Sequence, residues 1–267
     1  MFRILARFPL GLLQGAGALM GLVAFVSSAS YRAKIDANLR RAGLPAKMRW
    51  VCALQSGCTI GELPFVWFGG TDRLLSKVRS DDLAVFEQAC ESGRGVLMLT
   101  PHLGAFEVAA RYLAARAPIT VLFKPPRQRP LVALLSAARN QESMRSVPTN
   151  LSGVRALLRA LRAGEVVGLL PDQVPDAGQG EWADFFGEPA YTLTLPHRLA
   201  QQASPAVVIG ACVRLGWGRG WQLHMETFDG DPSPQALNAA MEALVRNWPA
   251  QYLWGYNRYK QPRGAVR

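Results

Sequence analysis

Short apolar runs alternate with longer helical segments along most of this chain, and this alternation constrains its fold more than any other feature. Runs that are typical of buried strands lie at residues 96–100, 119–123, 166–170, 206–213 and 221–227, with a short strand at 147–149. Helices are predicted at residues 36–68 (as one or two helices), 81–90, 103–116, 131–140, 152–162 (capped by Ser152) and 193–202. Strands that alternate with helices build a mostly parallel sheet covered on both faces. We therefore expect an α/β fold with a mostly parallel central sheet flanked by helices.

An uncharged segment precedes this α/β region. No charged residue occurs from residue 8 to residue 29, and Gln14 is the strongly polar side chain in its apolar centre. A helix over these 22 residues would extend about 33 Å, which is enough to cross the hydrocarbon core of a bilayer. We expect residues 1–30 to form an N-terminal membrane anchor helix and residues 31–267 to form one catalytic domain.

Glycines and basic residues refine the placement of this segment. Two G-x-x-x-G spacings permit close approach of another helix: Gly11/Gly15 and Gly17/Gly21. A basic cluster follows the segment: Arg32, Lys34, Arg40, Arg41, Lys47 and Arg49. Such a cluster places the globular region on the cytoplasmic side of a membrane. Two alternatives stay open, a helix that lies in the membrane interface and a signal peptide cleaved after Ser27-x-Ala29, although the positive charge disfavours export.

Composition restricts the kinds of partner. Lys and Arg number 30 against 19 Asp and Glu, which is a net charge of +11. A basic balance of this size indicates an anionic partner: nucleic acid, an anionic lipid surface or an acidic protein. The four cysteines form no C-x-x-C pair and the three histidines lie far apart in the sequence, so no zinc site is predicted.

One polar pair stands at the end of a predicted strand. His102 follows the run at residues 96–100, where open α/β sheets place their ligand sites. Glu107 lies five positions later, and Pro101 and Gly104 permit a turn that brings the two side chains together. A neutral imidazole can take a proton from an alcohol, and a carboxylate on its other nitrogen holds the tautomer. By its spacing alone, the pair fits either a general base for acyl transfer or a histidine at the edge of the core with a glutamate on the surface. The sequence contains no G-x-S-x-G motif, which disfavours a serine hydrolase.

Four ordered blocks of sequence resemble one known family. They are Asn38-Leu39, the HX4E block His102-Leu-Gly-Ala-Phe-Glu107, the block Leu170-Pro-Asp-Gln173 followed by Gly180 and Phe185-Phe186-Gly187, and residues 251–260 (Gln-Tyr-Leu-Trp-Gly-Tyr-Asn-Arg-Tyr-Lys). Together they extend over most of the chain and resemble the bacterial late lipid A acyltransferases, the lauroyl/myristoyl transferase family. The resemblance implies a glycerol-phosphate-acyltransferase-like fold.

The resemblance also implies a reaction and its partners. The implied reaction moves a fatty acyl chain from acyl carrier protein to a hydroxyl of a lipid A precursor, with His102 and Glu107 as catalytic residues and with no metal or organic cofactor. Both substrates are anionic, which suits the net charge of +11. The implied location is the cytoplasmic face of the bacterial inner membrane. We expect no nucleic-acid partner, because no helix-turn-helix, ribonucleoprotein or finger motif is present.

Four further residues are candidates for substrate binding. Lys124 follows the predicted strand at residues 119–123 and stands where the family typically has Arg, so it could hold a phosphate as a point charge. Asp172 ends a predicted strand and would orient the acceptor, back a basic group or cap the next turn. Gln173 belongs to the same block. Arg258 lies among tyrosines, an arrangement that suits a lipid headgroup or a packed chain end.

Departures from the family pattern leave the acceptor open. Ala105 and Phe106 replace the usual Asn-Trp, and the chain is shorter than usual between residues 140 and 152. The same chemistry on another lipid, such as a glycolipid or an ornithine-type lipid, is therefore one alternative. A non-catalytic basic protein that binds membranes or nucleic acid is another, and salt-sensitive DNA binding without acyl transfer would distinguish it.

Overall fold

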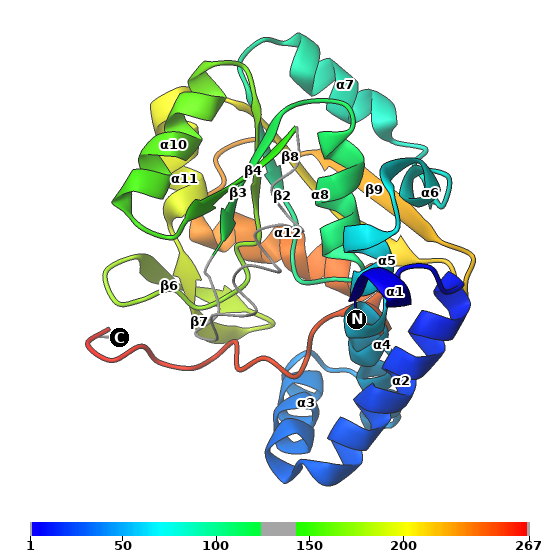
Figure 1. The fold of residues 1–267 in the computed structure, drawn as a ribbon. Helices are drawn as coiled ribbons and strands as arrows, with labels where there is room; N and C mark the ends of the chain where they lie inside the picture. The colour runs from blue at the N-terminus through cyan, green and yellow to red at the C-terminus, as the bar shows by residue number, and fades with distance from the viewer. Residues whose placement is uncertain (1, 124–142, 266–267) are drawn as a thin grey trace.

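A seven-stranded sheet forms the centre of the computed structural model, which describes residues 2–123 and 143–265 (Figure 1). The strand order is β1-β9-β8-β2-β5-β3-β4. The strands are β1 (Val78–Arg79), β2 (Val96–Leu99), β3 (Ile119–Phe123), β4 (Met144–Pro148), β5 (Val166–Leu169), β8 (Ala206–Arg214) and β9 (Trp221–Thr227). Among these described strands, β8 and β9 run antiparallel and every other neighbouring pair is parallel. The expected α/β class with a mostly parallel sheet is confirmed.

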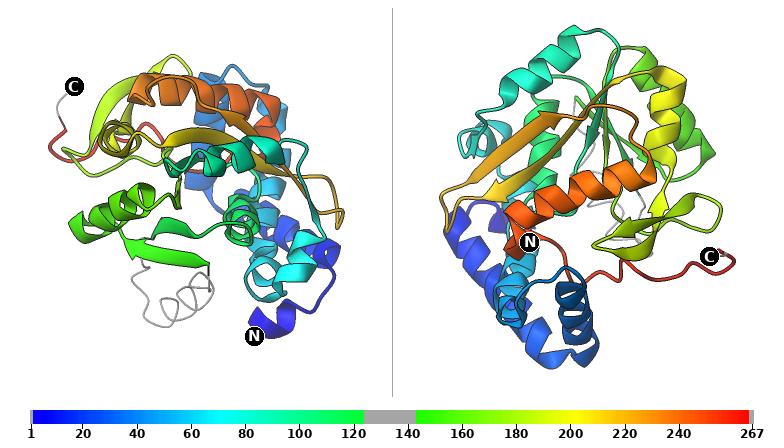
Figure 2. Two further views of the ribbon diagram at one scale, coloured as in Figure 1. Left: turned by 90° about the horizontal axis from the view of Figure 1, so that it is seen from above. Right: turned by 180° about the vertical axis from the view of Figure 1, so that it is seen from behind.

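Helices cover both faces of this sheet (Figures 1 and 2). One face carries α7 (Leu83–Glu91) and α8 (Phe106–Ala114), and the other carries α10 (Leu151–Arg162), α11 (Leu195–Ala203) and α12 (Pro234–Asn247). Along β2, Val96 and Met98 belong to the core under α7 and α8, while Leu97 and Leu99 belong to the core under the other three helices. Because successive strand residues point to opposite faces, a strand buried on both sides has to be apolar throughout.

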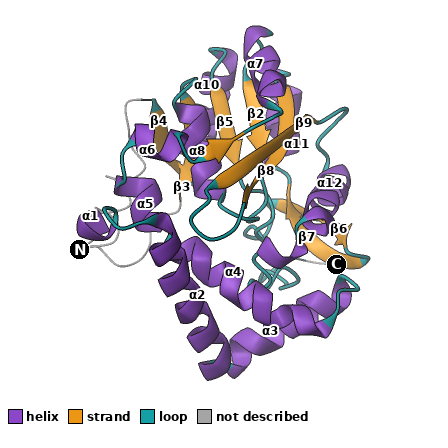
Figure 3. Cartoon of the chain, turned by 90° about the vertical axis from the view of Figure 1, so that its right-hand side faces the viewer, coloured by secondary structure: helices purple, strands orange, loops and turns teal. Residues whose placement is uncertain are grey.

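An arm of helices extends away from the sheet (Figure 3). The N-terminal helices are α1 (Phe2–Leu5), α2 (Leu10–Ser27), α3 (Ala29–Arg41), α4 (Arg49–Gly61), α5 (Leu63–Phe68) and α6 (Thr71–Leu75), with a short 3₁₀ turn, η1 (Ala46–Met48), before α4. The arm consists of α2, α3 and α4, while α5 and α6 lie against the body beside α8. The region at residues 36–68, expected as one or two helices, is thus divided among α3, α4 and α5.

Glycines bring α2 and α4 into backbone contact. A Cβ added at Gly17 would collide with the carbonyl of Gly57, and a Cβ added at Gly57 would collide with the carbonyl of Gly17. Gly21 and Gly61 lie equally close to backbone atoms of the opposite helix, whereas Gly15 faces open space. The apolar helix of the expected anchor therefore packs tightly against α4, which belongs to the region expected as the catalytic domain.

The opposite face of α2 is apolar and exposed. Its exposed side chains are Leu12, Leu19, Met20, Val23 and Val26. Within residues 2–123 and 143–265, α2 is the one helix long and apolar enough to cross a membrane. Exposed basic side chains lie on and after the adjoining α3: Lys34, Arg40, Arg41 and Lys47.

The structure corrects two predicted helix starts. The helix expected at residues 103–116 begins at Phe106, because Gly104 has a φ of +64° and the preceding residues form a turn. The helix expected to be capped by Ser152 is capped by Asn150, whose side chain accepts a hydrogen bond from the Gly153 N–H at 3.1 Å.

Several elements, among them β6, β7, α12 and η2, were not predicted, and one prediction cannot be compared. A separate hairpin consists of β6 (Gly180–Phe185) and β7 (Glu188–Leu193), and α12 packs beside it. A 3₁₀ turn, η2 (Pro249–Gln251), follows α12. The helix predicted at residues 131–140 lies outside the described residues.

Candidate active site

The candidate site lies between two neighbouring strands, at the carboxyl edge of the sheet. β2 and β5 are parallel, with Leu99 opposite Leu169. His102 follows Leu99 by three residues, and Asp172 follows Leu169 by three residues. This register brings the two loops together, so His102 lies beside Asp172 where open α/β sheets bind their ligands.

Both nitrogens of the His102 ring have a partner. Nδ1 lies 2.7 Å from Oδ1 of Asp172, and the His102 backbone N–H donates to Oδ2 of the same carboxylate at 2.9 Å. Because a carboxylate only accepts, the neutral ring carries its proton on Nδ1 and its lone pair on Nε2. The side-chain nitrogen of Gln173, an exposed residue, donates to Nε2 at 3.1 Å. The His102 side chain is 16% exposed and the Asp172 side chain 4%, so the ring lies at the border of the interior.

The Asp172 carboxylate is buried yet ionised. Burial would raise its pKa, but the charge of His102 and the hydrogen bonds from the His102 ring and backbone lower it, and the charge of Arg258 adds to them. The pKa of Asp172 therefore lies below its ordinary value. Burial and the Asp172 charge also raise the pKa of the neighbouring Tyr252, whose hydroxyl stays protonated.

Arg258 supports this carboxylate from the interior. Its Nη1 donates to the carbonyl of Tyr191 at 2.9 Å, and its Nη2 donates to Thr192 Oγ1 at 2.6 Å and to Asn238 Oδ1 at 3.1 Å. The side chain is 2% exposed, so the structure does not place it in contact with a substrate as predicted. The other predicted cation, Lys124, lies outside the described residues.

Glu107 does not take the position at Nδ1 of His102, which Asp172 occupies. It occupies the first turn of α8, and its Oε2 accepts a hydrogen bond from the Trp67 indole at 3.2 Å. Its charge also acts on Arg111 of the same helix. The edge of the Phe106 ring, one residue earlier, packs on His102 with 4.8 Å between ring centroids. We predicted that Glu107 holds the imidazole, whereas the carboxylate at Nδ1 belongs to Asp172, which the pairing of β2 with β5 brings beside the ring.

Two distant segments hold the loop that contains His102. The His102 carbonyl accepts from the Leu253 N–H at 3.1 Å, and the Gly104 N–H donates to the carbonyl of Gln251 at 3.0 Å. On the other side, Gly104 bridges to Cys212 of β8, whose carbonyl a Cβ at Gly104 would strike. The C-terminal block at residues 251–260 thus contacts the candidate site through its first residues.

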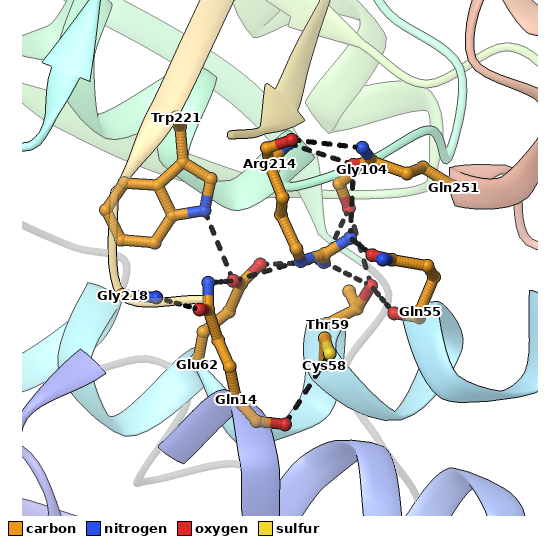
Figure 4. Close-up of polar contacts among 10 residues, drawn as sticks. All are labelled: Gln14, Gln55, Cys58, Thr59, Glu62, Gly104, Arg214, Gly218, Trp221 and Gln251. Atoms are coloured by element: carbon orange, nitrogen blue, oxygen red, sulfur yellow. Dashed lines mark hydrogen bonds and ion pairs between the residues drawn. The ribbon is translucent and has the colours of Figure 1, made fainter. Parts of the chain in front are cut away.

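A buried polar cluster beside this loop was not predicted (Figure 4). Arg214, at the end of β8, forms an ion pair with Glu62, between α4 and α5, at 2.7 Å. Gln14 of α2 also donates to Glu62 at 3.2 Å. A signal was present in the sequence, because Glu62 is the sole acidic residue between Asp36 and Asp72 and is surrounded by apolar residues. An isolated acid of this kind needs a buried partner.

Comparison with known proteins identifies the family of this chain. The model of the family described as bacterial lipid A biosynthesis acyltransferase matches residues 2–261. The chain belongs to this family. The resemblance drawn from the four sequence blocks is therefore confirmed, and with it the expectation of a family of acyl-transferring enzymes.

Individual relatives carry the same description. A lipid A biosynthesis acyltransferase of Haemophilus influenzae is 31% identical over 178 residues, which cover 63% of this chain and 54% of that protein. The lipid A biosynthesis palmitoleoyltransferase of Escherichia coli is 24% identical over 211 residues, covering 76% of this chain and 68% of that protein. The lauroyltransferase of the same organism is 24% identical over 217 residues, covering 78% and 70%. The match thus spans little more than half of the Haemophilus protein's length.

Proposed function

We propose that this chain transfers a fatty acyl group from acyl carrier protein to a hydroxyl of a lipid A precursor, with His102 as the general base. The observation that carries the proposal is the orientation of the imidazole. Oδ1 of Asp172 lies 2.7 Å from Nδ1 and accepts the proton that Nδ1 carries. This arrangement leaves the Nε2 lone pair to accept a proton. The names of the family and of its relatives support the lipid substrate.

The acceptor hydroxyl takes the place of the Gln173 amide at Nε2. As the hydroxyl oxygen forms its bond to the thioester carbonyl carbon, its proton passes to Nε2. The carbon–sulfur bond then breaks, and the imidazolium returns the proton to the leaving thiolate. Asp172 stays ionised and stabilises the imidazolium from Nδ1. This scheme uses no metal ion and no organic cofactor. Once displaced from Nε2, the Gln173 amide lies beside the acceptor, and we assign it to acceptor binding.

Glu107 and Lys124 keep proposed roles beside this pair. Glu107 orders the start of α8 through its hydrogen bond from Trp67, and this helix carries the Phe106 ring that packs on His102. Lys124 directly follows β3, whose carboxyl end lies at the same edge of the sheet as that of β5. A cation there would hold a phosphate of the lipid or of the carrier's phosphopantetheine arm.

We also propose that the arm places the enzyme on the cytoplasmic face of the inner membrane. The exposed apolar face of α2 would enter the hydrocarbon region, and the exposed cations of α3 would contact anionic headgroups. An acidic carrier protein and a phosphorylated lipid both suit a chain with a net charge of +11.

Acyl transfer by the detergent-purified enzyme tests the proposal. The assay supplies acyl carrier protein with a labelled acyl chain, together with a lipid A precursor, and compares the parent with His102→Ala. Loss of a general base should lower kcat by about 10²–10⁴-fold. Turnover of His102→Ala close to the parent would exclude the base. Mass spectrometry of lipid A from cells with and without the gene should show one acyl chain fewer without it.

The acceptor is tested separately with a panel of lipids. Ornithine-type lipid and a phosphate-free glycolipid replace the lipid A precursor at equal concentration. We expect transfer to the lipid A precursor to be fastest. Transfer that is faster to another lipid, and that is abolished by His102→Ala, would keep the chemistry and change the substrate.

A further inference from the structure

The buried cluster beside the His102 loop centres on one ion pair (Figure 4). Arg214 donates to Glu62 through two nitrogens, with Nε 3.1 Å from Oε2 and Nη2 2.7 Å from Oε1. The two side chains are 3% and 2% exposed. An isolated charge is very costly to bury, so each of these groups depends on the other and on its hydrogen bonds.

The hydrogen bonds of this pair are saturated. Glu62 Oε2 also accepts from the Gln14 side chain and from the Trp221 indole, each at 3.2 Å. Arg214 Nη1 donates to Gln55 Oε1 at 3.3 Å and to Gln251 Oε1 at 3.4 Å. A planar guanidinium held at all three nitrogens has no freedom to change its orientation.

The remaining contacts of Arg214 reach the loop that contains His102. Its Nη2 donates to the carbonyl of Gly104 at 3.1 Å and to Thr59 Oγ1 at 2.6 Å. The side chain of Gln251 bonds both backbone groups of Arg214, while its carbonyl accepts the N–H of Gly104. Gly104 lies two residues from His102, and both its N–H and its carbonyl are therefore hydrogen-bonded to residues of this cluster.

Stability alone is a weak reason for this arrangement. A buried ion pair often contributes no more than apolar side chains of the same volume would. What apolar side chains cannot do is donate to the Gly104 carbonyl. Gly104 also has a φ of +64°, and the loop depends on contacts with other segments to keep this backbone conformation.

We propose that Glu62 and Arg214 form a positioning pair, which fixes the Gly104 carbonyl and thereby the direction of the His102 imidazole. The pair does not touch the reacting atoms and acts through the loop. The proposal rests on the proposed role of His102 as the base. It predicts that loosening the pair lowers kcat while KM for both substrates changes little, because an error of about 1 Å in placing a reacting group can cost 10²-fold.

Two variants and a control test the pair in the acyl-transfer assay. The double substitution Glu62→Leu with Arg214→Met replaces both charges by apolar side chains, which can keep the fold while removing the Arg214 donor to the Gly104 carbonyl. The milder Thr59→Val leaves the Glu62–Arg214 fork in place and removes a hydroxyl that accepts an Arg214 N–H and itself donates to the Gly104 carbonyl at 3.4 Å. Phe86→Leu, on α7, serves as a control that weakens core packing and leaves every hydrogen bond described for this cluster in place.

The expected result is a fall in kcat of about 10²-fold for the double variant and about five-fold for Thr59→Val, with KM within two-fold. Phe86→Leu should keep the kcat of the parent even if its unfolding temperature falls as far as that of the double variant or of Thr59→Val. A double or Thr59→Val variant with the kcat of Phe86→Leu at matched unfolding temperature would overturn the positioning role. If the double variant does not fold, Thr59→Val decides by the same comparison.

His102→Ala in the same experiment separates this proposal from the proposed function. An inactive His102→Ala beside fully active cluster variants rejects the positioning pair alone. An active His102→Ala rejects the base, and the positioning pair with it.

Discussion

At the His102 imidazole the two nitrogens have different tasks, and the partner of Nδ1 decides which one is basic. Asp172 holds Nδ1 at 2.7 Å, whereas Glu107 receives the Trp67 indole at 3.2 Å. The two carboxylates therefore differ in what they support. One orients the proposed base, and the other orders the helix that follows it.

Substitution of the two carboxylates distinguishes these tasks. We expect Asp172→Asn to lower kcat by about 10²–10⁴-fold, because an amide can present a donor to Nδ1 and reverse the tautomer. We expect Glu107→Gln to lower kcat less, because the amide oxygen still accepts the Trp67 N–H. Steady-state kinetics with the labelled acyl donor measure both. A larger loss for Glu107→Gln than for Asp172→Asn would mean that Glu107, as the sequence predicted, is the carboxylate that acts in turnover.

The lowered pKa of Asp172 also predicts a pH dependence of stability. A carboxyl group whose pKa is lower in the folded state stabilises the fold above its unfolded value, about 3.9, and loses this contribution as pH falls through the folded value. The difference in unfolding temperature between the parent and Asp172→Asn should therefore be largest near pH 7. It should shrink as pH falls below about 4. Thermal unfolding from pH 7 to pH 3 measures it, and a difference that grows on acidification would contradict this sign.

Arg258 and Lys260 form a matched pair of cations for a further test. Arg258 is buried against the β6–β7 hairpin, whereas Lys260 is exposed beside the Tyr256 ring. Arg258→Met should lower the free energy of unfolding by about 1–3 kcal/mol, because it leaves buried acceptors unpaired. Lys260→Met should change it by less than about 0.5 kcal/mol. Equal stabilities of the two variants in urea would return Arg258 to the list of substrate-binding candidates.

At the scale of elements, α2 is both the proposed membrane-facing helix and part of the protein's interior. One side carries the exposed apolar residues, and the other meets α4 through glycines and places Gln14 against Glu62. The same helix therefore contacts the cluster that holds the His102 loop. Its position is set by backbone contact, which tolerates no side chain.

Two glycines of α2 test this contact. Alanine favours a helix over glycine by up to about 1 kcal/mol, so Gly15→Ala, which faces open space, should stabilise the protein. Gly17→Ala should instead destabilise it by about 1–3 kcal/mol, because its Cβ would meet the Gly57 carbonyl. Denaturant unfolding in detergent measures both. A stabilised Gly17→Ala would show that α2 and α4 are not packed as described.

For the whole molecule, the proposed attachment to membranes and the folding of the body both depend on α2. Removal of residues 1–30 would take away the anchor, but it would also uncover the glycine face of α4 and remove one donor from Glu62. A truncated chain therefore reports on stability as well as on membrane binding. Substitutions on the exposed face of α2 separate the two properties.

The combined change Leu19→Ser with Val23→Ser should weaken binding to vesicles of anionic phospholipid and leave the unfolding temperature within about 2–4 °C of the parent. Loss of apolar area on the exposed face of α2 explains the first effect, and the large exposed fraction of both side chains explains the second. Deletion of residues 1–30 should release the chain from vesicles and also lower its unfolding temperature. Unchanged vesicle binding by the double variant would show that another surface holds the membrane.

Local patterns determined the fold class and the family of this protein. The runs that became β2, β3 and β5 are apolar because both faces of a central parallel strand are covered, so composition alone identifies them. The HX4E block and the block at residues 170–173 were equally visible, because each follows such a strand. The hairpin β6–β7 and α12 were not predicted, because their sequence patterns are short or mixed and these elements are stabilised by packing against each other.

Tertiary structure alone decided which of these residues meet. The position of Asp172 beside His102 follows from the adjacency of β2 and β5. The burial of Arg258 depends on a hairpin more than sixty positions earlier in the chain, and the Glu62–Arg214 pair joins residues 152 positions apart. Hydrophobic periodicity and helix or strand propensity act within one element, whereas the partner of a buried charge depends on which elements lie side by side in the folded protein.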